Sequence, residues 1–560
     1  MADYLHGAYG QINAVGNRVA GASQGAIVYI GTAPVHTIAG GAKNVNKPIL
    51  ISNMAAAREY FGYSDDWANY SLCEPMSVHL KTKGVGPLVL INVLDPEAHK
   101  ATTHKSVSKT PSSGSFTITS AEYILVDSLE VATKVKGTDY TVAYDEDTKT
   151  ITVTEKTAGS LGSDPLTVTY DEITVTTTSK TPSKGIIQIA SAESIILDSI
   201  EVATKTKGTD YTVSYNIDAK IITIAETSSG SLGTSALSIT YQSIDPTKVT
   251  NADVIGYSDG LGKNTGTYAV KDVYQLTGYI PSFIAAPGFS SDTLVHEALY
   301  GNSKKINGHW DAYMFVDLPL VSGGTAVTLD TAYTVKTSGG FTKENETVFF
   351  PIAAGVDGKK YHLSVLAAAN FQELLMNQDA IPYRTASNTE CSLIENLYLG
   401  EAYLDRIFDD ELINKKLNQN GIASAVFVGG RWAIWGAHSA DYDQSAATQI
   451  NVSETNRMML YYISNDFQVR RSRDVDKPMT MNDIKTIVSE EQARLDALKN
   501  MGAIIYGTVA MNASPSAKAD ILNGDWSFSF TVTTTPLAKS LTAIVAWTDD
   551  GFATYFEDAA

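Results

Sequence analysis

The sequence predicts a multidomain α/β (α+β) chain that carries two tandem inserted antiparallel β-sandwich modules. Three observations lead to this expectation. The chain has 560 residues, which corresponds to about three to five domains of ordinary size. The stretch 109–173 recurs at 180–244 with an offset of 71 residues and no gap. Outside these repeats, strand-like apolar runs alternate with helical patterns, which is typical of α/β folds.

The two repeats read as β-structure. Each contains short runs in which apolar and polar residues alternate, separated by turn residues, and this pattern favours a small antiparallel sandwich. In the first copy the runs are 115–120, 140–145, 149–155 and 166–171. Between His104 and Asp245 the chain has no Trp, Met, Cys or Arg, although these residues occur on both sides. We therefore expect that the modules are inserted into a loop of a host domain.

The host chain before and after the repeats shows the alternation of an α/β core. Buried strands are expected at 26–31, 88–93, 283–286, 312–316 and 349–352. Helices are expected at 53–61, with Asn53 as N-cap, and at 71–83, 293–300 and 363–376.

The C-terminal part continues this pattern. The sequence predicts a helix over 401–417, a hairpin formed by 423–428 and 431–435, and helices over 451–467 and 481–499, the last capped by Thr480 or Asn482. Strict alternation then predicts two strands, 526–534 and 541–547.

Composition limits the functional classes. A hydrophobic content of 44% with 18% charged residues is that of a globular chain. The excess of 61 acidic over 42 basic side chains, a net charge of −19, disfavours binding to a phosphate backbone, so we expect no nucleic-acid partner. The N-terminus lacks the features of a secretion signal, and the longest apolar runs, 87–94 and 421–428, are less than half of the ~20 residues that a membrane helix needs. We expect no membrane insertion.

Residues suited to catalysis or cofactor binding are scarce. The glycine-rich stretch 256–264 departs from the phosphate-loop spacing, and Asn264 stands where that motif has a hydroxyl. The nine His and two Cys show no metal-ligand spacing, and Cys73 and Cys391 fit a core better than a nucleophile. The acidic turn 145–147 is not kept in the second repeat, which disfavours calcium. We expect no enzyme, no metal and no cofactor.

One basic cluster stands out in this acidic chain. Arg470, Arg471 and Arg473 follow one another closely near the end of a predicted helix. Three arginines in a chain of this net charge suit a protein contact or pairing at the helix end better than nucleic acid.

The order of several motifs resembles that of the tail sheath proteins of contractile phages and related bacteriocins. The matching segments cover most of the host chain and none of the repeats, and the segment 351–371 matches only loosely. They include GAIVYIGTAP (25–34), GVGPLVLINVL (84–94), ADVIGYSDGLGKNTGTYAVKDVY (252–274), HWDAYMFVDLP (309–319), LNQNGIASAVFVGGRWAIWGAHS (417–439) and YYISNDFQVRRSRDVDKPMTMNDIKTIV (461–488).

This resemblance implies a mechanical role. Sheath subunits stack as six-membered rings around an inner tail tube, and contraction on a baseplate signal drives the tube through the host envelope. The implied partners are further copies of the chain, the inner tail tube protein, and the baseplate and tail terminator proteins. The implied location is the virion tail, after assembly in the cytoplasm of the host bacterium.

The resemblance also implies that both terminal arms reach into neighbouring subunits and complete a shared sheet. The expected arm residues are Tyr4, Tyr9, Ile12 and Val15 in the N-terminal arm, and Phe528, Phe530, Val532, Ile544 and Val545 in the C-terminal arm. The first 22 residues are polar and rich in Gly and Ala, so they lack the apolar surface for a core of their own. Strand addition would order such arms. The cluster Arg470, Arg471 and Arg473 is the expected contact with the tube or a neighbour.

The expected organisation has six parts. They are an N-terminal arm (1–22), a discontinuous first core (23–103 and 246–350), the two modules (104–175 and 176–245), a C-terminal core (351–524) and the C-terminal arm (525–560). Two other classes stay open at this point: a cell-surface adhesion protein with immunoglobulin-like modules, and a hydrolase with an unrecognised site.

Overall fold

The structure is a computed structural model that describes residues 25–445, 450–512, 521–553 and 555. The expected N-terminal arm residues Tyr4, Tyr9, Ile12 and Val15 lie outside this described part. The chain divides into two compact units, Met1–Val475 and Asp476–Ala560, which are described separately below.

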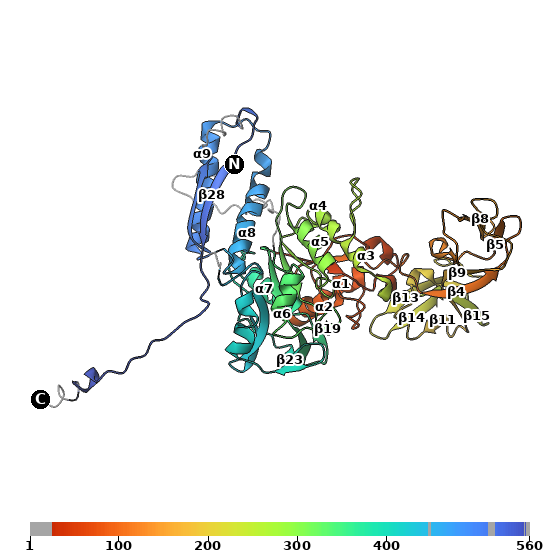
Figure 1. Ribbon diagram of the computed structural model, residues 1–560, viewed down its shortest axis with the longest axis horizontal. Coiled ribbons are helices and arrows are strands. Elements are labelled where there is room, and N and C mark those ends of the chain that lie inside the picture. Colours follow the sequence, from red (N-terminus) through yellow and green to blue (C-terminus); the bar gives the residue numbers. More distant parts are fainter. Residues whose placement is uncertain (1–24, 446–449, 513–520, 554, 556–560) are drawn as a thin grey trace, which may run out of the picture. The chain divides into compact units, whose positions relative to one another are not determined.

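The first unit is organised around an eight-stranded sheet (Figure 1). The strand order is β2 (Ile49–Ile51), β3 (Leu88–Asn92), β1 (Ile27–Gly31), β16 (Phe283–Ala285), β17 (Tyr313–Asp317), β20 (Glu346–Phe349), β25 (Ile422–Val428) and β26 (Arg431–Trp435). The six inner strands run parallel, and the two edge strands pair antiparallel. Every residue of β1, β3, β16, β17 and β20 is buried. This burial on both faces explains the continuous apolar runs in the sequence.

Helices cover this sheet, and most begin where the sequence predicts. In α1 (Met54–Phe61), the side chain of Asn53 accepts a hydrogen bond from Ala56 N at 3.0 Å, as expected for the N-cap. Helix α7 has the predicted bounds, Leu363–Met376, and is almost wholly buried. Shorter elements complete the layers: α2 (Cys73–Pro75) with a π-helix (Met76–Lys83), α3 (Asn251–Ile255), α4 (Val273–Thr277), α5 (Thr293–Ser303) and α6 (Ala332–Ser338).

Two expectations for this unit are wrong. The segment 401–417 does not form one helix: β24 (Tyr403–Asp405) lies there and pairs antiparallel with β23 (Ile394–Tyr398). These strands belong to a four-stranded sheet of order β22 (Lys360–Tyr361), β21 (Ile352–Gly355), β23 and β24, so cross-strand pairing outweighs the local helical pattern. The expected strand 349–352 is split between β20 and β21, because Pro351 has no amide hydrogen to donate to a ladder.

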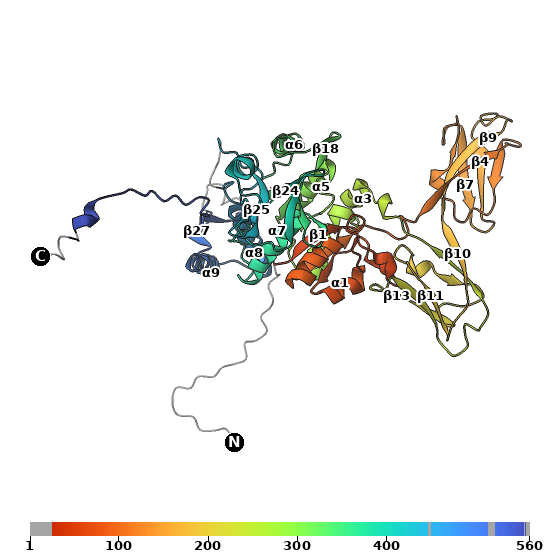
Figure 2. The same ribbon diagram turned by 90° about the horizontal axis from the view of Figure 1, so that it is seen from below.

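Each repeat forms two three-stranded antiparallel sheets around an apolar core of its own. In repeat 1 the sheets are β4 (Thr102–Lys109), β9 (Leu166–Ile173) and β6 (Glu130–Val131), and β5 (Ser115–Ile118), β8 (Thr150–Glu155) and β7 (Tyr140–Asp145). In repeat 2 they are β10 (Val175–Lys180), β15 (Leu237–Gln242) and β12 (Glu201–Val202), and β11 (Ile186–Ile189), β14 (Ile221–Glu226) and β13 (Tyr211–Asn216). Figure 2 shows the two repeats as separate groups of strands.

The chain leaves the host and returns to it at adjacent points. Ala101 N donates to Ser243 O at 2.8 Å, and Asp245 N donates to His99 O at 2.8 Å. Because the two ends meet, the host can close its own core across the base of the repeats.

A pair formed by the buried Glu74 and the half-buried His362 ties α7 to the layer that contains α2. One oxygen of Glu74 accepts from His362 N, and the other lies 2.6 Å from His362 Nδ1. Burial alone would lower the pKa of His362, but the Glu74 carboxylate raises it to about 9. The imidazole is therefore charged at neutral pH, and the pair joins two segments that are distant in sequence.

This pair predicts a pH dependence of stability. The folded pKa of about 9 lies above the ordinary value of 6.5, so the contribution is complete below about pH 6.5 and is lost as the pH rises through 9. We expect His362→Gln to flatten the fall in unfolding free energy between these pH values, measured by urea denaturation. The exposed His309→Gln serves as control and should keep the wild-type slope. Equal slopes for all three proteins would contradict the assignment.

Candidate assembly surface in the C-terminal unit

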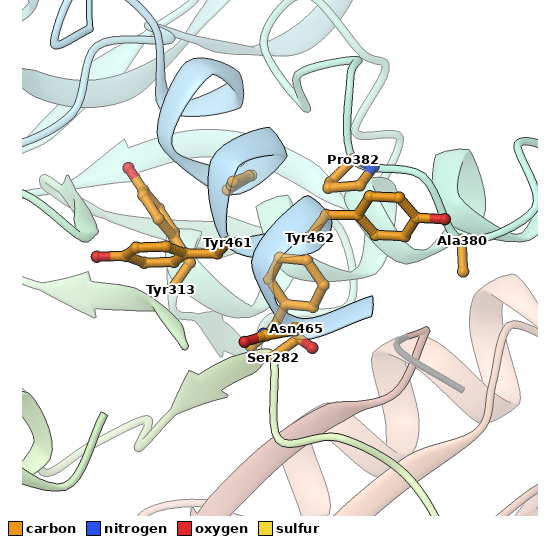
Figure 3. A pocket seen from close by; sticks show the side chains of 9 residues that line it. Ser282, Tyr313, Ala380, Pro382, Tyr461, Tyr462 and Asn465 are labelled. Atoms are coloured by element: carbon orange, nitrogen blue, oxygen red, sulfur yellow. The ribbon is translucent and has the colours of Figure 1, made fainter. Parts of the chain in front are cut away.

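The first unit ends in a long helix that is fixed to the central sheet. In α8 (Glu454–Arg471), the Asn465 side chain accepts from Asp311 N at 3.2 Å and donates to Asp311 O at 2.9 Å. Figure 3 shows Tyr461, Tyr462 and Asn465 of this helix around a small pocket that also contacts Ser282. Bonds to the backbone just before β17 hold the helix in one orientation, so α8 extends the host rigidly.

The expected basic cluster lies at the end of α8, and two of its members are paired within the same segment. Arg470 Nε donates to Asp466 Oδ2 at 3.0 Å, and Arg471 Nη1 donates to Asp474 Oδ2 at 3.3 Å. Arg473 follows in a 3₁₀ turn (Ser472–Asp474) and is exposed. The pairing that the sequence offered as one alternative, at the helix end, therefore accounts for part of this charge.

The second unit is built from one helix and a two-stranded sheet. Helix α9 (Met481–Asn500) begins with a capping box, in which Thr480 and Asp483 each bond the other's backbone N–H. Its buried apolar residues are Ile484, Ile487, Leu495 and Leu498. This face packs against β27 (Ile504–Met511), a strand that the sequence analysis did not predict although its composition is rich in β-branched and aromatic residues.

Strand β28 (Phe528–Thr534) completes this sheet and lies within the expected strand 526–534. It pairs antiparallel with β27, from Met511 opposite Phe528 to Ile504 opposite Thr534. Phe528, Phe530 and Val532 alternate as half-buried residues between exposed Ser and Thr. In the part of the chain that the structure describes, neither strand has a second neighbour.

The segment that follows β28 exposes large apolar side chains. Leu541, Ile544, Val545 and Trp547 are each more than four-fifths exposed. The expected strand over 541–547 is wrong for the single chain, which has no regular secondary structure there (Figure 1, dark blue). The physical reason is that alternation marks a segment fit for a sheet, but a strand forms only when a partner supplies the hydrogen bonds.

The two cysteines of the chain lie in the interior of the first unit. Cys73 and Cys391 are buried, and burial raises the pKa of each thiol to about 12, which opposes a role as nucleophile. Among the described residues, no group of three His, Cys, Asp or Glu side chains is arranged to hold a metal ion. None of the described helices combines the length and apolar character needed to cross a bilayer.

Comparison with known proteins gives one informative relative. A tail sheath protein of Burkholderia phage BcepMu is 32% identical over 131 residues, which are 23% of this chain and 26% of that protein. The chain has a relative among the phage tail sheath proteins. This match confirms the resemblance read from the motifs, and it spans about a quarter of the relative's length. No known protein-family profile matches the chain.

Two solved structures of sheath tail proteins are similar over most of their length. That of Desulfitobacterium hafniense is 12% identical, with 90% of this chain and 93% of that chain covered and a TM-score of 0.44. That of Listeria innocua is 13% identical, with 92% and 96% covered and a TM-score of 0.42. At these TM-scores the likeness does not establish a shared fold.

The packing of α9 on β27 predicts the stability of the C-terminal unit. Leu495 is 2% exposed, so Leu495→Ala should lower the free energy of unfolding of this unit by about 2–4 kcal/mol. Hydrogen exchange of the peptide 504–511, followed by mass spectrometry, measures the effect locally. Lys485→Ala, on the exposed face of α9, should leave the exchange unchanged. Protection that survives Leu495→Ala would show that α9 does not hold the sheet.

Proposed function

We propose that the chain is a structural subunit of a contractile tail sheath and not an enzyme. The observation that carries this proposal is the segment that follows the sheet of the C-terminal unit, in which Leu541, Ile544, Val545 and Trp547 are exposed. A segment with the alternation of a strand and exposed apolar side chains is suited to pair with another copy of the chain. The tail sheath relative and the order of the motifs support the same proposal.

In this proposal, the segment 541–547 adds to a sheet of a neighbouring subunit, as does the N-terminal arm 1–22 with Tyr4, Tyr9, Ile12 and Val15. Ile544 and Val545 become buried on binding, while β28 with Phe528, Phe530 and Val532 stays paired with its own β27. A contact between two different surfaces of the same protein gives a closed ring if its rotation returns to the first subunit, and an open helical array if it does not. The subunits form stacked hexameric rings around an inner tail tube.

The free energy of binding of one such arm is small, which suits an assembly held together by many arms. Burying four large apolar side chains is worth about 1.5–3 kcal/mol each. Ordering the seven residues 541–547 costs about 1–2 kcal/mol per residue, which is as large as this gain. Each arm therefore contributes little by itself, and many arms together hold a polymer. Subunits can then change their packing during contraction without unfolding.

The remaining parts of the chain take their roles from this assembly. The domains are those expected from the sequence, with the arms at 1–22 and 525–560 and the repeats as β-sandwich modules inserted in one loop of the host. The modules face outward, because the inner surface must fit the tube. Arg473, with Arg470 and Arg471 beside it, contacts the tube or a neighbour. The baseplate and a tail terminator are further partners, and the assembly belongs to a virion built in the bacterial cytoplasm. The composition and the relative do not favour a cell-surface adhesion protein.

The proposal predicts that removal of the C-terminal arm abolishes assembly and spares the fold. Electron microscopy of the concentrated chain, alone and co-expressed with a tube protein, should show hollow helical tubes. A chain that ends at Thr534 should remain monomeric with an unchanged circular dichroism spectrum. Ile544→Asp with Val545→Asp should have the same effect, because two charges cannot be buried in a shared sheet.

A matched control is Asp549→Asn with Asp550→Asn, which changes charge by two units just beyond the apolar segment and should still give tubes. Tubes from the chain that ends at Thr534 would refute the role of the arm. Persistent monomers of the full chain, even with the tube protein present, would count against the sheath.

A further inference from the structure

A cleft of about 200 Å³ lies between repeat 2 and the host. Its host wall comes from α1 and the segment after it, and its other wall comes from β13 and the turn after that strand. Figure 2 shows β13 next to the part of the host that contains α1. Pockets for drug-sized molecules hold about 300–1,000 Å³, so this cleft suits a smaller ligand, of the size of one sugar ring.

Hydrogen bonds and an ion pair hold the two walls together. His36 Nε2 donates to Glu193 O at 2.7 Å, and burial lowers the pKa of this histidine to about 4, so the ring is neutral. Gly40 N donates to Asp198 Oδ2 at 2.7 Å. Arg58 Nη2 lies 3.3 Å from Asp218 Oδ1. The cleft is therefore preformed in the single chain.

The charges of the cleft leave one cation without a partner. Three acidic and three basic side chains line it. Each acid has a cationic partner, and the pairs are Asp218 with Arg58, Glu193 with Lys220, and Asp65 with Lys359, which approaches from outside the lining. Lys81 lines the cleft and forms no ion pair with a residue that the structure describes. One unpaired positive charge favours a ligand with a single anionic group.

Free hydroxyl groups accompany this lysine. Within the described residues, the hydroxyls of Tyr70 and Tyr215 have no hydrogen-bond partner, and the ammonium group of Lys81 has none either. Burial raises the pKa of Tyr215 to about 12, so its hydroxyl stays protonated. A tyrosine hydroxyl both donates and accepts, whereas a lysine only donates. The set matches a ligand that combines hydroxyl groups with one carboxylate.

Three aromatic rings give the cleft apolar surface beside these polar groups. Tyr63 and Tyr70 of the host are 8% and 6% exposed, so packing fixes their positions, and Tyr215 faces them from repeat 2. The Tyr63 hydroxyl donates to Asp65 at 3.1 Å, which holds this ring further. An aromatic side chain offers an apolar body and a polar tip, and both are needed to bind a sugar ring with its C–H faces and hydroxyl groups.

We propose that this cleft binds a sugar that carries one carboxylate, such as a uronic acid unit. The carboxylate pairs with Lys81, the sugar hydroxyls bond to Tyr70 and Tyr215, and the sugar ring packs on the tyrosine rings. The site belongs to the single chain, so it does not depend on assembly of a sheath.

Repeat 1 provides a matched control for this site. It has the same side chains 71 positions earlier, where Glu122, Tyr144 and Lys149 correspond to Glu193, Tyr215 and Lys220. In the part of the chain that the structure describes, Glu122 and Lys149 form no hydrogen bond or ion pair through their side chains with the host. One wall of the cleft alone lacks Lys81 and Tyr70, so repeat 1 should not bind the sugar.

Isothermal titration calorimetry of the full chain tests the site with glucuronate and galacturonate, and with glucose and galactose as neutral counterparts. At least one uronic acid should bind about tenfold more tightly than its neutral counterpart. Lys81→Gln should remove this difference and leave the neutral sugar unaffected, because only the carboxylate meets Lys81. Tyr215→Ala should weaken both sugars, whereas Tyr144→Ala in repeat 1 should change neither. Circular dichroism checks that each variant keeps the fold.

Hydrogen exchange locates the bound sugar independently. The uronic acid should protect peptides from both walls, 58–70 and 211–220, and leave the equivalent peptide of repeat 1, 140–149, unchanged. Polygalacturonate and hyaluronate then separate two sources of the same chemistry: tighter binding per uronic acid unit indicates a polysaccharide, and equal binding indicates a free sugar.

Three results would overturn the site. They are no binding of either uronic acid at about 10 mM, equal affinities for the uronic acids and their neutral counterparts, and equal protection of 140–149 and 211–220. None of these results bears on the sheath, which is tested by the formation of tubes.

Discussion

Every buried backbone N–H and C=O group needs a hydrogen-bond partner, and this architecture depends on that constraint. In the host, parallel strands stacked between antiparallel edges satisfy it, and the inner strands can then be wholly apolar. The C-terminal unit meets it in part: β27 and β28 pair with each other, and α9 covers one face. Within the described residues, the segment 541–547 has no strand partner, so the same constraint that closes the host favours association at the other end of the chain.

Sequence patterns predicted the elements whose local signal agrees with their final environment. The helix 363–376 and the hairpin of 423–428 and 431–435 were predicted because burial, period and turn residues agree there. The segment 401–417 was not, because its partner β23 lies outside the window that a helical pattern samples. The strand 541–547 failed for the opposite reason: its pattern is that of a strand, but the partner is absent from the single chain. Local sequence reports the fitness of a segment for a structure, and tertiary or quaternary contacts decide whether it forms.

The sequence predicted only some features of the candidate assembly surface. Alternation identified Phe528, Phe530 and Val532, which the structure places as half-buried residues of β28, the strand that pairs with β27. The sequence shows Arg470, Arg471 and Arg473 as a cluster. The pairing of Arg470 with Asp466 and of Arg471 with Asp474 follows from the helix geometry. The two repeats show that similar sequences can differ in burial. Ile196 and Leu125 stand at equivalent positions of the two repeats, and the structure shows that Ile196 is buried whereas Leu125 is exposed.

A polymer that must rearrange is better served by many weak contacts than by a few strong ones. In the proposed sheath, the apolar gain of an arm is offset by its ordering cost, so each junction would stay within a few kcal/mol of dissociation and the array would be stable because the junctions act together. The net charge of −19 works in the same direction, because like-charged subunits repel until specific surfaces meet. In the proposed sheath, the arms then supply the continuity between subunits, and repulsion between acidic surfaces disfavours contacts that do not match.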